Sequence, residues 1–209
     1  MAALLLTVLT ACSTTTNKEG PAGLLKYFKE IPLSDTLRFE VSDNGAASSG
    51  DTIPTSFFFS QLETRLMNDI QYLDNSGEVQ VFGLNRFPLD ENTEAYLVDL
   101  RQHWYQHQSL FLFDKTAGAF TKRITVADFY GGDGGQILTG SWLFDYDKDG
   151  SKDLVRQEIE HWLVMGGEEP RDTTVEHAAL LLWKKGQFVA SPVQDPAALV
   201  RDFPIKSFW

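Results

Sequence analysis

Four aspartates close together in the second half of the chain are the side chains best suited to chemistry. Asp145, Asp147 and Asp149 alternate with other residues, Gly150 follows at once, and Asp153 comes soon after. Alternating carboxylates let one short loop turn several oxygens towards a single centre. Ca²⁺ requires such an arrangement, because it is a hard cation that takes about 6–8 oxygen ligands in a flexible shell. The stretch therefore predicts a calcium-binding loop.

The residues around the aspartates indicate what kind of loop this is. Gly150 stands where the loop must reverse sharply, and a positive φ is costly there for any residue with a Cβ. An EF-hand loop would carry a bidentate glutamate at its twelfth position and would lie between two helices. Counted from Asp145, that position is Arg156, which cannot be a ligand. The approach over residues 139–144 is typical of a strand, whereas the exit over residues 154–164 suits a strand or a helix.

The spacing D-x-D-x-D-G-x-x-D-L resembles the calcium loop of integrin-type FG-GAP repeats, in which a β-hairpin carries the loop. The resemblance implies bound Ca²⁺ at residues 145–153, with the side chains of Asp145, Asp147, Asp149 and Asp153 and the backbone carbonyl of Ser151 as ligands. The motif occurs once here, whereas FG-GAP propellers repeat it in several blades, so a full propeller is not expected. We expect the ion to hold a hairpin in place rather than to act in catalysis. The alternative is an ordinary solvated acidic turn, since Asp, Gly and Ser are common turn residues.

A second motif lies at the N-terminus. Residues 1–11 are apolar and lead into L-T-A-C, which resembles the lipobox of bacterial lipoproteins. The resemblance implies a signal peptide over residues 1–11, lipidation of Cys12, and a place in the cell envelope, at the outer membrane in a Gram-negative cell. The alternative is an apolar chain end with a chance cysteine. Cys12 is the only cysteine, so no intramolecular disulfide can form.

Composition limits what the rest of the chain can be. Residues 12–23 are mostly small and polar, which predicts a flexible tether, and residues 24–209 have the length of a single domain. With 43% hydrophobic and 12% aromatic residues, the chain can build a core. The net charge of −11 and the lack of a basic cluster argue against a nucleic-acid partner.

Periodicity predicts an α+β fold. A near-helical apolar pattern over residues 54–69 favours a helix, and residues 24–30 favour a short one. From about residue 79 to residue 190 the pattern is of short β-prone runs, with hairpin signals around the turns at 114–118 and 184–187. We therefore expect a mostly antiparallel, hairpin-built sheet with one or two N-terminal helices. A partial propeller-like or sandwich arrangement of the strands is the alternative.

Few residues elsewhere favour catalysis. His103 and His107 have the spacing of a zinc-binding helix, but the glutamate of H-E-x-x-H is missing and the segment favours strands. Asp133, Glu158 and His161 are the candidates for a hydrolase site. No nucleophile elbow or other recognisable catalytic motif accompanies them.

Two functional hypotheses follow from the sequence. The first is a lipid-anchored binding module, stiffened by Ca²⁺, whose partner is an envelope protein or a polysaccharide; aromatic side chains would serve sugar stacking or simply the core. A subunit of a larger lipoprotein complex is a variant of it. The second is a hydrolase acting on envelope glycans or peptides.

Overall fold

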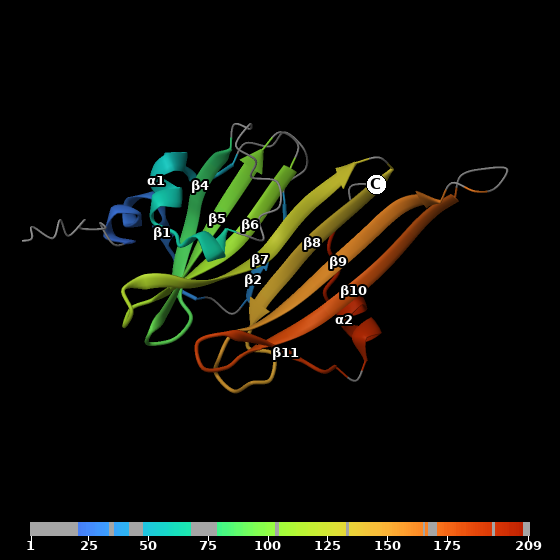
Figure 1. Ribbon diagram of the computed structural model, residues 1–209. Coiled ribbons are helices and arrows are strands. Elements are labelled where there is room, and N and C mark those ends of the chain that lie inside the picture. Colours follow the sequence, from blue (N-terminus) through green and yellow to red (C-terminus); the bar gives the residue numbers. More distant parts are fainter. Residues whose placement is uncertain are drawn as a thin grey trace, which may run out of the picture.

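The computed structural model describes residues 21–33, 36–41, 48–67, 79–102, 105–132, 134–164, 166, 171–193 and 195–206. The signal peptide, Cys12 and most of the tether predicted from the sequence lie outside these residues. Within them the chain forms one sheet of eleven strands, with two short α-helices beside it (Figure 1).

The elements follow one another mostly as a meander. The strands are β1 (Lys29–Glu30), β2 (Thr36–Phe39), β3 (Asp51–Ile53), β4 (Gln80–Pro88), β5 (Thr93–Gln102), β6 (Tyr105–Asp114), β7 (Ala119–Gly132), β8 (Gly135–Phe144), β9 (Asp153–Val164), β10 (Arg171–Trp183) and β11 (Phe188–Ser191). The α-helices are α1 (Thr55–Ser60) and α2 (Pro196–Asp202), and single 3₁₀ turns span η1 (Pro21–Gly23), η2 (Leu25–Tyr27) and η3 (Thr64–Leu66).

Tight turns join most of the neighbouring strands. Strands β4 to β11 pair antiparallel in chain order, and β1 alone pairs parallel, with β4. Between β10 and β11 only Lys185 and Gly186 separate the closing pair Lys184 and Gln187, and both have positive φ (50° and 74°). Such a turn matches the right-handed twist of the two strands. This hairpin and the one between β6 and β7 confirm the hairpin signals in the sequence.

The sheet divides at β8. On one side β8 pairs with β9 along its whole length. On the other side β7 pairs with β8 only from Asp128 to Gly132, and β2 takes over from Ser141 to Phe144. Gly140 lies at the junction, where a Cβ would come 2.5 Å from Cγ2 of Ile205. The sheet thus has two parts, β4–β7 and β8–β11, which share the upper half of β7 (Figure 1).

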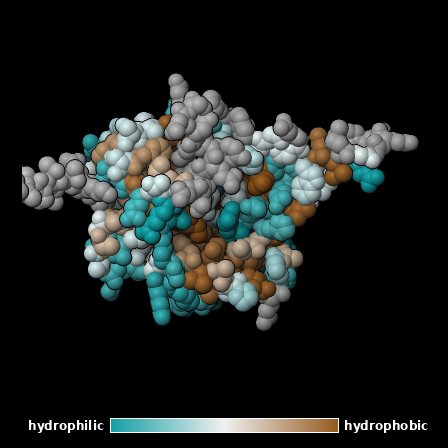
Figure 2. Space-filling view, viewed as in Figure 1, coloured by the Kyte–Doolittle hydropathy of each residue, from teal (hydrophilic) through white to brown (hydrophobic). Residues whose placement is uncertain are grey.

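One large hydrophobic cluster joins the two parts of the sheet. Its buried residues include Phe87, Leu97 and Leu112 from the first part and Leu143, Leu154 and Trp183 from the second. A second cluster lies under α1, around Phe58, Tyr96 and Phe111, and a third lies under α2, around Leu180 and Leu199. On the face seen in Figure 2, hydrophobic residues gather in the lower middle, with hydrophilic residues around them.

The structure confirms the β-rich character of the predicted fold and corrects its helices. The strands form one open, mixed sheet rather than separate propeller blades. The helix expected over residues 54–69 is wrong in length, because α1 ends at Ser60 and only the turn η3 follows it. The segment 24–30 is a 3₁₀ turn followed by β1. The second α-helix, α2, lies near the C-terminal end of the chain, where the sequence of residues 196–200 predicts a helical turn with Asp195 as N-cap, and the side chain of Asp195 accepts from the N–H of Ala198.

Candidate metal centre

The predicted calcium loop connects β8 to β9, so a β-hairpin carries it, as the FG-GAP resemblance implies. Two residues of the loop, Lys148 and Gly150, have positive φ (62° and 91°) and reverse the chain. Two aspartates close local turns, because Asp147 accepts from the N–H of Asp149 (3.2 Å) and Asp149 accepts from the N–H of Ser151 (2.8 Å). The left-handed conformation predicted for Gly150 is confirmed.

The loop brings three carboxylates together. Asp145, Asp147 and Asp149 each place one oxygen within 4.8 Å of the other two. Asp145 is half-buried, while the other two are exposed. Its Oδ2 accepts from the N–H of Gly150 at 3.1 Å, but its Oδ1 is buried and has no hydrogen-bond partner among the described residues. Buried carboxylate oxygens normally have a partner, and a cation bound between these carboxylates would supply one for this atom.

Asp153, the fourth predicted carboxylate ligand, has other partners in this structure. It is fully buried, and its Oδ2 accepts from the N–H groups of Tyr146 (3.1 Å) and Asp147 (3.4 Å). Its Oδ1 accepts from the N–H of Trp183 in β10 at 2.9 Å. Asp153 therefore shapes the loop and ties it to the next hairpin. Ser151, the fifth predicted ligand, contributes the N–H that Asp149 accepts.

Lys184 approaches the aspartates from the turn between β10 and β11. Its Nζ lies 2.7 Å from Oδ2 of Asp149 and 3.5 Å from Oδ2 of Asp147. Hydrogen bonding from Lys184, and then from Ser151, lowers the pKa of Asp149 to about 2, and the contact with Asp149 raises the pKa of Lys184. No local pattern in the sequence points to this lysine, which is 35 residues from Asp149. An exposed pair of this kind contributes little stability, so a divalent ion could displace it.

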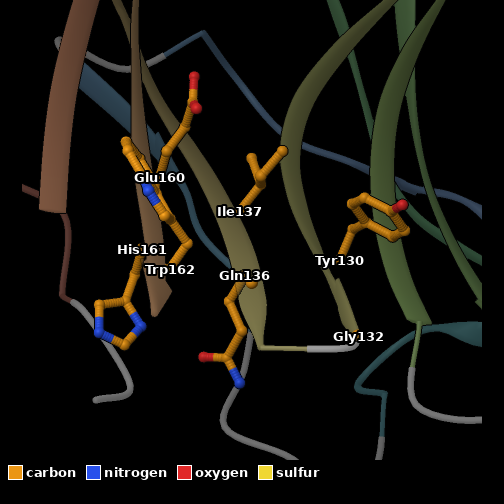
Figure 3. Close-up of a pocket in the computed structure, with 8 residues that line it drawn as sticks. Tyr130, Gly132, Gln136, Ile137, Glu160, His161 and Trp162 are labelled. Carbon is orange, nitrogen blue, oxygen red and sulfur yellow. The ribbon is translucent and has the colours of Figure 1, made fainter. Parts of the chain in front are cut away.

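A separate recess of about 480 Å³ lies at the opposite end of β8. Its lining is Tyr130, Gly132, Gly135, Gln136, Ile137, Glu160, His161 and Trp162 (Figure 3). Tyr130, Ile137 and Glu160 are direct cross-strand neighbours on β7, β8 and β9, and Trp162 stands opposite Gly135. The rings of Tyr130 and Trp162 lie on either side of Ile137 (Figure 3). From Ile137 to Asp145 the chain is extended for about 25 Å, so the recess is remote from the loop 145–153.

Of the residues proposed for a hydrolase, the two that the structure describes, Glu158 and His161, do not meet at one point. Glu158 pairs with Arg156 at 3.2 Å, and His161 lies 3.5 Å from Asp172. Glu160 and His161 both line the recess, but as sequence neighbours on a strand they project to opposite faces. Asp133 lies outside the described residues. Glu158 and Glu160 share one face and are partly exposed, as their spacing predicts.

His107 belongs to a buried polar cluster. Its Nδ1 lies 2.9 Å from the hydroxyl of Tyr105, and its Nε2 lies 2.6 Å from Oγ of Ser109 and 3.1 Å from Nη1 of Arg123. Asp128 is 3.7 Å from Nδ1. Serine, histidine and aspartate meet here, but Ser109 is fully buried, so no substrate reaches its hydroxyl in this conformation. His103 lies outside the described residues.

Comparison with known proteins found no matching family model, no matching curated protein and no matching solved structure. Among the described residues, no helix has both the length and the apolar character needed to cross a membrane.

Proposed function

We propose that this protein is a binding module of the cell envelope, anchored by a lipid on Cys12 and stabilised by Ca²⁺ in the loop 145–153. The single observation that carries the calcium part is the buried Oδ1 of Asp145, which lacks a partner beside the carboxylates of Asp147 and Asp149. The anchor rests on the L-T-A-C motif alone.

The role proposed for the ion is structural. Three carboxylates within 4.8 Å of one another repel each other, and Lys184 offsets only part of that charge. A divalent ion would neutralise them and give Asp145 Oδ1 its missing partner. The loop already begins and ends on paired strands, so the ion would fix the β8–β9 hairpin and leave the distant recess free for a partner.

The recess supports the binding part of the proposal. It combines two aromatic rings, Tyr130 and Trp162, with the carboxylate of Glu160 on the same face of the sheet. Aromatic faces with a few polar groups suit a polysaccharide or the side chains of an envelope protein. Because Glu160 and His161 project to opposite faces of β9, the recess offers no pair of groups aimed at one reacting atom, and we do not propose hydrolysis.

A calcium titration of the purified chain tests the proposal. Thermal unfolding in EDTA and in excess Ca²⁺ should differ, and linkage predicts about 2.7 kcal/mol of stabilisation at 100 times Kd. Asp145→Asn should abolish the effect, whereas the matched variant Asp172→Asn, on the exposed part of β10, should keep it. Lys184→Met should tighten Ca²⁺ binding, because it removes the competing ammonium.

Equal unfolding curves in EDTA and Ca²⁺, for the wild type and for Lys184→Met, would make the loop an ordinary acidic turn. The anchor has its own readout. Incorporation of a fatty-acid analogue in bacterial cells should be lost in Cys12→Ser, and labelling that persists there would contradict it.

A further inference from the structure

Strand β10 has an open edge. It pairs with β9 from Arg171 to Leu181, but with β11 only from Leu180 to Trp183. Figure 1 shows β11 beside the lower end of β10 alone. Among the described residues, the segment Arg171–Ala179 therefore has no strand on its second side. An open edge of this length is a template for another strand.

The turn between β10 and β11 determines which backbone groups face that edge. Lys184 and Gln187 exchange both N–H···O bonds (2.8 and 3.2 Å), so even-numbered residues of β10 direct their backbone groups away from β9. The odd-numbered residue Trp183 follows the same alternation, because its N–H points towards β9 and donates to Asp153 at the start of that strand. Further up the strand, Asp172, Thr174 and Glu176 present their N–H and C=O groups to the open edge.

Several of the usual protections of an edge strand are missing from this segment, although Arg171, Asp172 and Glu176 carry charges. Arg171–Ala179 contains no proline and no lysine, and its register with β9 runs without a bulge. Val193 packs in the cluster that includes Ala178, so the free part of the edge is centred on Thr173–His177.

We propose that a second copy of this chain pairs with this edge, antiparallel, about a two-fold axis at Val175. This interface does not depend on the proposed calcium site. With a two-fold axis, both copies use the same segment of β10. The residue that lies on the axis then determines which residues of the two copies stand opposite each other. A self-complementary register is therefore required, and the side chains of β10 can be tested for one.

The charged side chains of β10 limit which residue can lie on the two-fold axis. A centre at Thr174 would place Asp172 opposite Glu176, and a centre at Glu176 would place Glu176 opposite itself. Like charges directly opposite each other destabilise a pair of strands. An axis at Thr173 would pair only residues 171–175 with their copy and leave the rest of the open edge unpaired.

The centre at Val175 avoids these conflicts. It places Thr174 opposite Glu176 in hydrogen-bonded pairs and Thr173 opposite His177 in the pairs between them. The two copies of Val175 then meet in a non-hydrogen-bonded pair, in which side chains approach most closely.

A single proline substitution should prevent this pairing between copies without changing the fold of the monomer. Thr174→Pro removes an N–H that faces the open edge and none that faces β9, and proline is tolerated on such edges. We expect the wild type to dimerise with rising concentration in analytical ultracentrifugation, and Thr174→Pro to stay monomeric with an unchanged unfolding midpoint. Thr174→Val, which keeps the N–H, should still dimerise.

Disulfide trapping tests the register, even where the proline variant fails to fold. In a Cys12→Ser background, Val175→Cys should crosslink to itself, since the two Cβ atoms meet across the axis. Thr173→Cys should not, because it stands opposite His177. A wild type that remains monomeric at every concentration, a Thr174→Pro dimer, or crosslinking of Thr173→Cys in place of Val175→Cys would overturn the proposal.

Discussion

Asp90 and Asp153 hold Trp183 from two directions. Asp153 Oδ1 accepts the backbone N–H of Trp183, and Asp90 Oδ2 accepts its indole N–H at 3.0 Å. Asp90 also accepts from the N–H groups of Asn92 and Thr93 in the turn between β4 and β5. Carboxylates that accept several N–H bonds are strong local anchors. These two therefore join the loop 145–153, the end of β10 and the β4–β5 turn at one end of the molecule.

Replacing Asp153 by asparagine should destabilise the fold. An amide nitrogen cannot accept, so at least one of the three N–H groups now bound by Asp153 would lose its partner in a buried site. Hydrogen bonds to charged groups contribute about 1.5–3 kcal/mol each, and we expect a loss in that range. Urea unfolding measures it. Asp172→Asn, at an exposed position, is the control and should change the free energy of unfolding by less than about 0.5 kcal/mol.

At this scale the sequence predicted the part of the site that is local. Asp145, Asp147 and Asp149 come together because alternation and Gly150 fix the loop from within. The partners of Asp153 were not predictable in the same way. Its burial depends on Trp183, 30 residues later, and Lys184 comes from that same distant hairpin. A sequence pattern specifies short-range geometry, whereas these contacts arise from pairing of β9 with β10.

At the scale of elements, turn chemistry was the most informative signal. The Lys-Lys-Gly-Gln turn and the run Asp114–Gly118 both predicted hairpins, and both are present. The periodicity of segment 54–69 predicted one continuous helix, which is wrong. Its apolar residues, among them Phe58, Leu62 and Leu66, lie on two separate short elements and the residues between them, and all three belong to one hydrophobic cluster. The pairing of β2 with β8 joins segments about a hundred residues apart, and no local pattern predicts it.

Gly140, where β8 passes from β7 to β2, tests how tightly the C-terminal segment packs on the sheet. A Cβ there would come 2.5 Å from Cγ2 of Ile205 and 3.3 Å from the carbonyl of Phe39. We expect Gly140→Ala to cost about 1–3 kcal/mol, as other overpacked sites do. Gly132→Ala is the control, because a Cβ there meets nothing within 4 Å.

A double-mutant cycle identifies the cause. Ile205→Ala removes Cγ2, so Gly140→Ala should cost less in that background than in the wild type. Additive costs in urea unfolding would show that the clash with Ile205 is not what destabilises Gly140→Ala.

For the whole molecule, the question is whether the two parts of the sheet form one cooperative unit. The end of β7 that pairs with β8 joins them at one end. At the other end, near the loop 145–153, three hydrogen bonds join them: Trp183 donates to Asp90, and Lys122 donates to the carbonyl of Gly186 (3.2 Å) and to Gln187 (2.9 Å). Between these joints, one hydrophobic cluster contains residues of both parts. The single domain expected over residues 24–209 remains a prediction, and this arrangement makes it testable.

The two parts should therefore unfold together. Urea curves from far-UV circular dichroism and from amide exchange in β5 and β9 should share one midpoint, because neither part can keep its half of the shared cluster buried alone. Trp183→Phe removes the indole donor but keeps most of the packing, so it should lower stability by about 1–2 kcal/mol while the midpoints still coincide. If β9 exchanged freely at urea concentrations where β5 stayed protected, the two parts would be separate folding units and Trp183 would be only a contact between them.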